Sequence, residues 1–213
     1  MMYLADLLLV VAILMNFLAL GAREMRVCIR AAALQGAVLS ILPLLVHRDP
    51  GVNALLMAAG AAAMKGILIP TLLQKAMRDV HVAHEVEPYV GFVPSLFLAG
   101  IGTALAILFA DRLPLAPEHV GSLIVPASLA TLFSGFLLMT TRRKAIMQVV
   151  GYLLLENGVY VFGLLLIEAM SFLVEVGVLL DLLVAIFIMG IVLNHIRREF
   201  SSLDTEQLAG LRE

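Results

Sequence analysis

The chain has 213 residues, of which 62% are hydrophobic and only 14% are charged, and its mean hydropathy is +1.05. This composition excludes an ordinary soluble domain and is typical of a polytopic membrane protein. The net charge of -2 is uninformative for a chain buried in lipid, whereas the positions of the charges are informative. The single cysteine, Cys28, excludes an internal disulfide and iron–sulfur ligation by this chain alone.

Apolar runs between short charged loops predict an all-α, polytopic membrane protein with about seven transmembrane helices. Runs of about 18 apolar residues or more are long enough to cross a hydrocarbon core ~30 Å thick. The predicted spans are residues 2–21, 28–46, 52–74, 90–110, 120–140, 146–167 and 172–196.

The basic residues are distributed unevenly between the predicted loops. Of the 14 Lys and Arg residues, only Arg48 and Arg112 fall on one side of the membrane, Lys65 lies inside a span, and all the others fall on the opposite side. Because positive residues favour the cytoplasmic side, the N-terminus is predicted outside and the C-terminus in the cytoplasm.

Two carboxylates lie near the middle of consecutive spans. Glu156 lies eleven residues into a segment that begins at Ala145, and Asp181 lies ten residues into one that begins at Ser171. At a rise of ~1.5 Å per residue, both acids lie about 15 Å deep, near the middle of the membrane. A charge at that depth costs several kcal/mol, so these acids favour an ion or proton path. The alternative is that both stay protonated and only form hydrogen bonds between helices.

Lys65 lies nine residues, or about 14 Å, from the end of its span near Gln74, which is also close to mid-depth. Small residues around it allow another helix to approach closely, and Pro70 is expected to kink the helix. We expect Lys65 to face the same polar layer as Glu156, either paired with a carboxylate or bridged to one by water. Gln35 is the deep polar residue of the second span, where a neutral amide usually serves as a contact between helices.

His81, His84 and Glu85, in the loop after the third span, have a spacing that can hold a metal, but their order matches neither zinc-protease signature. A solvated loop that contacts a partner subunit is the better interpretation. The sequence also contains no nucleophile with a base, no phosphate-binding glycine loop and no cofactor motif, so no metal or cofactor is expected and the chain is predicted not to carry bond chemistry itself.

Arg142-Arg143, then Gly151 and Asn157, and then a helix that ends in His195-Ile-Arg-Arg form a recognisable pattern. Over about residues 122–198 this pattern resembles the three-helix K subunit of respiratory complex I. The longer chain, with Gly-Tyr-Leu-Leu-Leu-Glu-Asn-Gly at 151–158, resembles component E of hydrogenase 4.

Two positions depart from the K-subunit pattern. The K family has a glutamate two residues after the glycine, where this chain has Leu153, and Glu156 follows three residues later on the same helix face. On the second helix, the K-family glutamate corresponds to Leu183, whereas the acid in this chain is Asp181.

The resemblance implies an N-terminal four-helix portion (1–119), a K-subunit-like three-helix portion (120–198) and a cytoplasmic tail (199–213). It implies a non-catalytic subunit of a complex I-like hydrogenase assembly, packed against antiporter-like subunits in the cytoplasmic (inner) membrane of a prokaryote. Glu156, Asp181 and Lys65 are predicted to form a mid-membrane proton or ion path, with a secondary polar path through Gln35, Asn157 and His195. The alternative is a purely structural subunit that conducts no ions.

Overall fold

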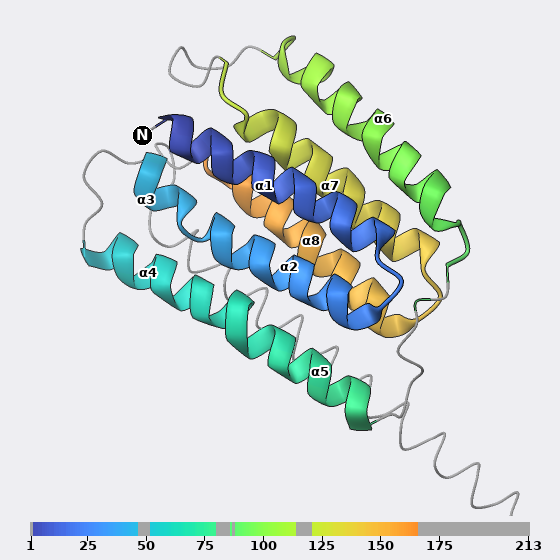
Figure 1. Cartoon of the computed structure of the whole chain (residues 1–213). Coiled ribbons are helices and arrows are strands. Elements are labelled where there is room, and N and C mark those ends of the chain that lie inside the picture. Colours follow the sequence, from blue (N-terminus) through green and yellow to red (C-terminus); the bar gives the residue numbers. More distant parts are fainter. Residues whose placement is uncertain (1, 47–51, 80–85, 87, 114–120, 166–213) are drawn as a thin grey trace, which may run out of the picture. The chain divides into compact units, whose positions relative to one another are not determined.

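The structure is a computed structural model that describes residues 2–46, 52–79, 86, 88–113 and 121–165 (Figure 1). Every regular element in these ranges is a helix. In chain order the elements are α1 (Met2–Gly21), α2 (Met25–Leu39), α3 (Leu42–Val46), α4 (Val52–Ala63), the π-helix η1 (Met64–Leu68), α5 (Ile69–Asp79), α6 (Phe92–Ala110), α7 (Ile124–Thr141) and α8 (Ala145–Gly163). All described residues belong to one compact unit, Met1–Ser171.

Five helical stretches in the described part of the chain are long and apolar enough to cross a membrane. They are Tyr3–Gly21, Met25–Leu45, Phe92–Ala110, Ile124–Thr141 and Ile146–Gly163. They correspond to five of the predicted spans, which confirms an all-helical membrane protein. The seventh predicted span, 172–196, lies outside the described residues, so the count of seven and the orientation stay predictions.

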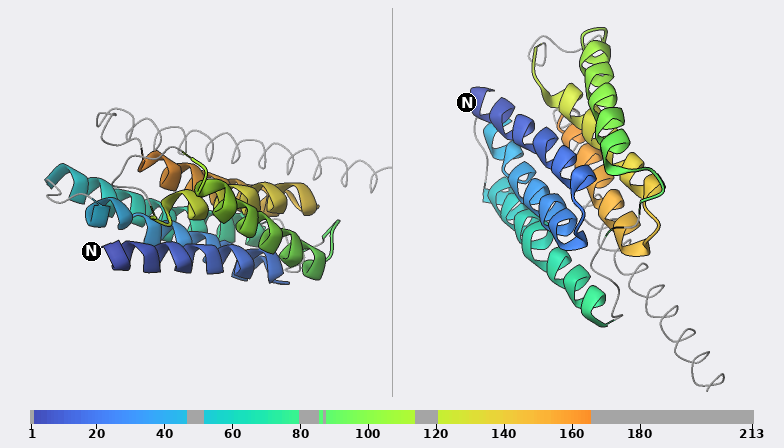
Figure 2. Two further views of the ribbon diagram at one scale, coloured as in Figure 1. Left: turned by 90° about the horizontal axis from the view of Figure 1, so that it is seen from above. Right: turned by 45° about the vertical axis from the view of Figure 1, so that its right-hand side comes forward.

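The helices form a bundle with two inner pairs and two edges. α7 packs along α8, and α1 packs along α2, while contacts of α1 with α7 and of α2 with α8 join the two pairs. α6 lies at one edge against α7, and the α4–η1–α5 rod lies at the other edge against α2 (Figures 1 and 2). The outer face of α6 is apolar, since Val93 and Phe97 are more than two-thirds exposed, as suits a surface that meets lipid.

Glycines bring α7 and α8 into very close contact. A Cβ atom added to Gly151 would lie 2.7 Å from the backbone nitrogen of Met139 and 2.9 Å from the carbonyl oxygen of Gly135. A Cβ atom on Gly158 would lie 2.7 Å from the backbone nitrogen of Leu132. Small residues at a helix crossing let two backbones approach in this way, and here they fix α8, which carries Glu156.

The second predicted span, 28–46, differs from the observed helices in its ends and in its continuity. α2 begins at Met25 and ends at Leu39, and the short α3 follows after a turn at Ser40 and Ile41. Pro43 explains the break, because a proline ring clashes with the carbonyl group four residues earlier, which belongs to Leu39.

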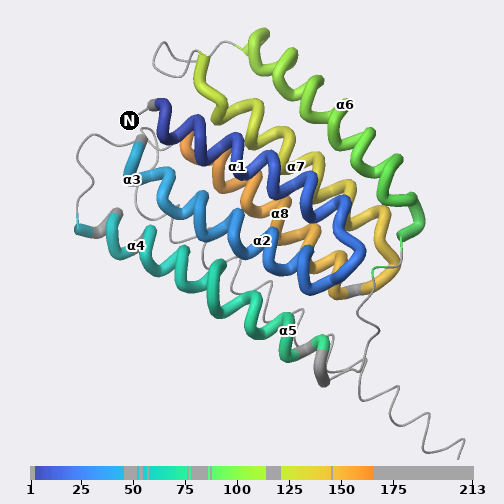
Figure 3. The backbone as a smooth tube through the Cα atoms, in the orientation of Figure 1, coloured from blue at the N-terminus to red at the C-terminus, as the bar shows by residue number. Residues whose placement is uncertain are grey.

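The chain from 52 to 79 is helical throughout and forms a continuous rod (Figure 3). Its α-helix is divided by η1, where the backbone N–H of Ile69 donates to the carbonyl oxygen of Met64. Pro70 follows directly and has no N–H group to donate. The sequence predicts that Pro70 can kink the helix, and the structure has a wider π-helical turn directly before it, one of the local irregularities at which helices bend.

Loops converge at the two ends of the bundle. At one end, the backbone N–H of Val86 donates to the Arg23 carbonyl (2.8 Å) and that of Tyr89 donates to the Thr141 carbonyl (2.7 Å). We call this the Arg142 end. At the opposite end, the Asp6 carboxylate accepts a hydrogen bond from the backbone N–H of Leu123 (3.3 Å), and we call this the Asp6 end.

Candidate functional site: a buried ion pair at mid-depth

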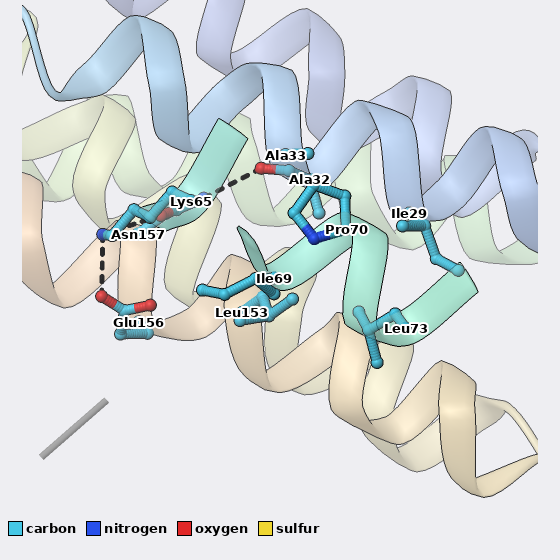
Figure 4. Close-up of a pocket in the computed structure, with 10 residues that line it drawn as sticks. All are labelled: Ile29, Ala32, Ala33, Lys65, Ile69, Pro70, Leu73, Leu153, Glu156 and Asn157. Atoms are coloured by element: carbon cyan, nitrogen blue, oxygen red, sulfur yellow. Dashed lines mark hydrogen bonds and ion pairs between the residues drawn. The ribbon is translucent and has the colours of Figure 1, made fainter. Parts of the chain in front are cut away.

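A buried ion pair joins η1 to α8. The Nζ atom of Lys65 lies 2.7 Å from Oε1 of Glu156, and both side chains are more than nine-tenths buried. Figure 4 shows the lysine stem reaching from the rod to α8, where its amine meets the carboxylate. The expected pairing of Lys65 with a carboxylate is therefore observed, and the partner is Glu156, one of the two acids predicted near mid-depth.

Two more groups of α8 surround the Lys65 ammonium. Lys65 Nζ donates to Oδ1 of Asn157 (3.2 Å), and it lies 4.7 Å from the centre of the Tyr160 ring. Glu156 and Tyr160 are four residues apart, so they share one face of α8. The cation thus meets a carboxylate, an amide oxygen and an aromatic face, all of which favour a positive charge.

A chain of side-chain amides continues from Asn157 across the bundle. Asn157 Nδ2 donates to Gln35 Oε1 (3.2 Å), Gln35 Nε2 donates to Asn16 Oδ1 (2.8 Å), and Asn16 Nδ2 donates to Thr131 Oγ1 (2.9 Å). We call Asn157, Gln35, Asn16 and Thr131 the amide chain. Its members come from α8, α2, α1 and α7, and none is more than 2% exposed.

The amide chain has a single direction. At each link the carbonyl oxygen is nearer to Lys65 and the NH₂ group is farther away, so every amide dipole presents its negative end towards the ammonium. Gln35 Nε2 also donates to the carbonyl oxygen of Ala12 (2.9 Å), which holds the orientation of that amide. In lipid, where water cannot satisfy a polar group, such complete pairing avoids a cost of several kcal/mol for each group.

Gly36 provides the space for these contacts. A Cβ atom at this position would lie 3.0 Å from Lys65 Cβ, 3.1 Å from Lys65 Cδ and 3.2 Å from Asn157 Oδ1. The lysine stem and the amide therefore pass directly over a bare stretch of the α2 backbone. The small residues predicted around Lys65 on its own helix are thus matched by a glycine on the facing helix.

A small cavity adjoins the ion pair. Its volume is about 10 Å³, counted as space for the centre of a water-sized sphere, which is room for about one water molecule. Its polar lining comes from Lys65, Glu156 and Asn157. The second carboxylate oxygen, Glu156 Oε2, is buried and has no hydrogen-bond partner in the described part of the chain. Figure 4 shows this oxygen turned away from Lys65, on the side where Leu153 and Ile69 line the cavity.

The structure thus brings together four residues that the sequence singles out: Lys65, Glu156, Asn157 and Gln35. Asp181 and His195 lie outside the described residues, as do His81, His84 and Glu85. Asn16 and Thr131 are not among the residues that the sequence singles out. Asn16 is an amide inside an apolar span, and this is a signal that the sequence contains. Its hydrogen-bond partners, Gln35 and Thr131, lie on other helices and can be recognised only in the folded bundle.

Arg142 forms a second buried polar centre, at the Arg142 end. Its side chain is 1% exposed, and it donates from Nη2 to the Leu20 carbonyl (2.6 Å) and from Nη1 to the Val90 carbonyl (3.0 Å). The Phe92 ring lies 5.0 Å from its guanidinium carbon. Burial lowers the pKa of the guanidinium below its usual range. A cation on the last carbonyl groups of α1 also complements the negative end of that helix, so Arg142 ties α1 to two loops.

Long apolar helices around a mid-depth ion pair define this chain as a polytopic α-helical membrane protein. It belongs to the same family as the Mycobacterium tuberculosis protein named Uncharacterized protein Rv0085, with 32% identity over 206 residues, covering 94% of this chain and 92% of that protein. Hydrogenase-4 component E of Escherichia coli K12 is a more distant homologue, 27% identical over 160 residues that cover 74% of this chain and 73% of that protein. The Shigella flexneri protein of the same name gives the same values. No family model and no solved structure matches the chain.

Proposed function

We propose that this chain is a membrane subunit of a hydrogenase-type, complex I-like assembly and that it contributes to a mid-membrane proton or ion path. The observation that carries the proposal is the Lys65–Glu156 ion pair, which is buried between two helices near the middle of their lengths. The homology to Hydrogenase-4 component E supports the type of assembly. The bacterial relatives support a place in a prokaryotic cytoplasmic membrane. The proposed partners there are antiporter-like subunits.

An ion pair of this kind is poorly explained by stability alone. A buried pair usually contributes little net stabilisation, because desolvation of the two charges offsets their attraction. A pair of titratable groups that can trade a proton, placed at mid-depth beside a cavity with room for water, is instead suited to proton transfer. Asp181 stays in the proposal as a predicted further member of the path, and His195 stays as a predicted member of the secondary polar path.

The amide chain is assigned a positioning role in this path. Amide groups do not readily take up or release protons, so Asn157, Gln35 and Asn16 cannot carry charge as Lys65 and Glu156 can. Their fixed direction holds an oxygen against the Lys65 ammonium, and this keeps the amine beside the carboxylate. Three of the helices involved, α1, α2 and η1, precede the K-subunit-like portion, so these additional helices supply the partner of its acid.

The test uses the whole assembly, isolated through a tag on this chain and reconstituted in vesicles. Hydrogenase-type subunits should co-purify, and hydrogen-linked turnover should acidify the vesicles. Glu156→Gln keeps the size and hydrogen bonding of the side chain but cannot ionise, so we expect normal assembly and a loss of acidification of about a hundredfold. Glu24→Gln is the matched control, because Glu24 is exposed at the Arg142 end and its side chain caps no helix.

The purely structural alternative makes the opposite prediction. If the acid only packs between helices, Glu156→Gln will assemble and acidify the vesicles as the wild type does, and the proton path is then wrong for this residue. If the tagged chain purifies alone in a folded, monodisperse form from membranes that contain a hydrogenase assembly, the assignment to such an assembly is wrong.

A further inference from the structure

We infer that the ion exchanged at the Lys65–Glu156 site is a proton and that this site does not bind sodium. The inference rests on the proposed function and specifies what the path carries. Three features support it: the lysine occupies the cation position at the carboxylate, the amide oxygens already accept hydrogen bonds, and the adjoining cavity is small.

The position that a metal cation would take at the carboxylate is held by the lysine. Lys65 Nζ lies 2.7 Å from Glu156 Oε1 and donates to Asn157 Oδ1 at 3.2 Å. These two oxygens are the ones that a sodium ion would need first, because a hard cation binds carboxylate and carbonyl oxygens. A second positive charge next to the ammonium would also be repelled by several kcal/mol in a site with little water.

In the described part of the chain, the remaining side-chain oxygens of the amide chain and of Glu156 do not form a coordination shell for sodium. Gln35 Oε1 accepts from Asn157, and Asn16 Oδ1 accepts from Gln35, so both amide oxygens already have a donor and are turned inward along the amide chain. Among the described residues, this leaves Glu156 Oε2 as the carboxylate oxygen without a partner. Sodium loses its hydration shell only where several protein oxygens replace it together, and one oxygen does not.

The size and the lining of the cavity beside Glu156 also favour a proton over sodium. It is about 10 Å³ in volume, enough for about one water molecule and too small for a hydrated ion. Beyond the three polar residues its lining is apolar, with Ile29, Ala32, Ala33, Ile69, Pro70, Leu73 and Leu153. One water there can donate to Glu156 Oε2 and accept from Lys65 Nζ, which connects the two groups by a second route.

A proton, by contrast, needs no additional ligand. The ammonium of Lys65 gives a proton to the carboxylate of Glu156, directly or through the water. An N–H bond breaks, an O–H bond forms, and the products are a neutral amine and a neutral acid. The net charge of the pair is zero before and after the step, so proton exchange inside the pair does not place a new unpaired charge in the membrane.

The test is ion replacement with the reconstituted assembly. Vesicle acidification is measured in nominally sodium-free choline chloride and in sodium chloride of equal ionic strength, and radioactive sodium uptake is followed in parallel. We expect acidification without loss in choline, no sodium uptake above that of vesicles without protein, and loss of acidification in Glu156→Gln. The thermal midpoint of the purified assembly should also be equal in the two salts, because a ligand that binds only the folded site would raise it.

The outcomes separate this inference from the function on which it rests. If translocation stops in choline, or if sodium uptake occurs and disappears in Glu156→Gln, then the path exists but the inference is overturned. If Glu156→Gln leaves acidification unchanged, the proposed path itself fails and the inference falls with it. A sodium-specific rise in the thermal midpoint that is absent from Glu156→Gln would also overturn the inference, because it would show sodium at this carboxylate.

Discussion

Gly36 is the residue at which α2 makes room for the ion pair. A methyl group there would press on the Lys65 stem at 3.0–3.1 Å and on Asn157 Oδ1 at 3.2 Å. Such contacts are tighter than ordinary van der Waals distances, so the lysine stem or the amide would have to move. Because a proton transfers only between groups in hydrogen-bond contact, a small displacement here affects the path more than it affects the fold.

We therefore expect Gly36→Ala to reduce vesicle acidification while the assembly still forms. Overpacking costs about 1–3 kcal/mol, and the gain in helix preference offsets about 1 kcal/mol of this, so the thermal midpoint should fall only slightly. The measurement is acidification per hydrogen-linked turnover, together with the thermal midpoint. Gly60→Ala on α4 is the matched control, since Gly60 is exposed and no atom of another part of the described chain lies within 4 Å of the added methyl group. Wild-type acidification in Gly36→Ala would show that this contact does not position the pair.

The sequence alone points to the ion pair and to Asn157 and Gln35 beside it, but not to Asn16, Thr131 or the burial of Arg142. The depths of Glu156 and Lys65 follow from their distances to the ends of their spans, because each helical residue adds a fixed rise. Arg142 shows the limit of this reasoning. Its basic character was sufficient to predict topology, yet its burial depends on the carbonyl groups of Leu20 and Val90, which are 122 and 52 residues away. Contacts over such separations have no signature in local spacing.

At the scale of elements, the positions of the helices could be predicted from the sequence, whereas their breaks and π-helical turns could be predicted only in part. Apolar runs predict where helices lie, because a polar backbone in lipid must satisfy its own hydrogen bonds. Pro43 and Pro70 mark the irregular positions, but the same residue type has two outcomes: α2 ends four residues before Pro43, whereas the rod continues past Pro70 through η1. The presence of a proline alone therefore does not distinguish the two outcomes.

The contact between α7 and α8 is the element-scale feature with the sharpest prediction. A methyl group on Gly151 would meet the backbone nitrogen of Met139 and the carbonyl oxygen of Gly135, which cannot move without moving α7 as a whole. We expect Gly151→Ala to force the two helices apart and to destabilise the protein by ~1–3 kcal/mol. The measurements are the thermal midpoint in detergent and the yield of co-purified assembly.

The control for this variant lies on the same helix. Gly163 is the last residue of α8, and no atom of the described residues outside its own helix turn lies within 4 Å of a methyl group added there. Gly163→Ala should leave the thermal midpoint and the yield unchanged. Equal behaviour of the two variants would contradict the close approach of α7 and α8 at Gly151.

At the scale of the whole molecule, the structure groups the loops by the end of the bundle at which they lie. The turn at Arg23, the segment 88–91 and the turn at Arg142 lie together, while Asp6 and Leu123 lie at the opposite end (Figure 1). Several described basic residues outside the bundle interior follow the same division: Arg23, Arg26, Arg143 and Lys144 lie at the Arg142 end, and Arg112, which follows α6, lies at the other. The alternation of loops deduced from the sequence therefore agrees with the fold for these segments.

The direction of the bundle in the membrane is the remaining prediction at this scale. A cluster of basic residues is retained on the cytoplasmic side during insertion, so the Arg142 end should face the cytoplasm. Reporter fusions after Lys75, after Lys144 and at the C-terminus should all read cytoplasmic, and fusions near Arg48 and Arg112 should read external. Replacement of Arg143 and Lys144, whose side chains are at least partly exposed, by glutamine should weaken this preference without removing the buried clamp that Arg142 forms. An external signal after Lys144 in the unmodified chain would reverse the assignment and would place the loop that follows Arg142 on the outer side of the membrane.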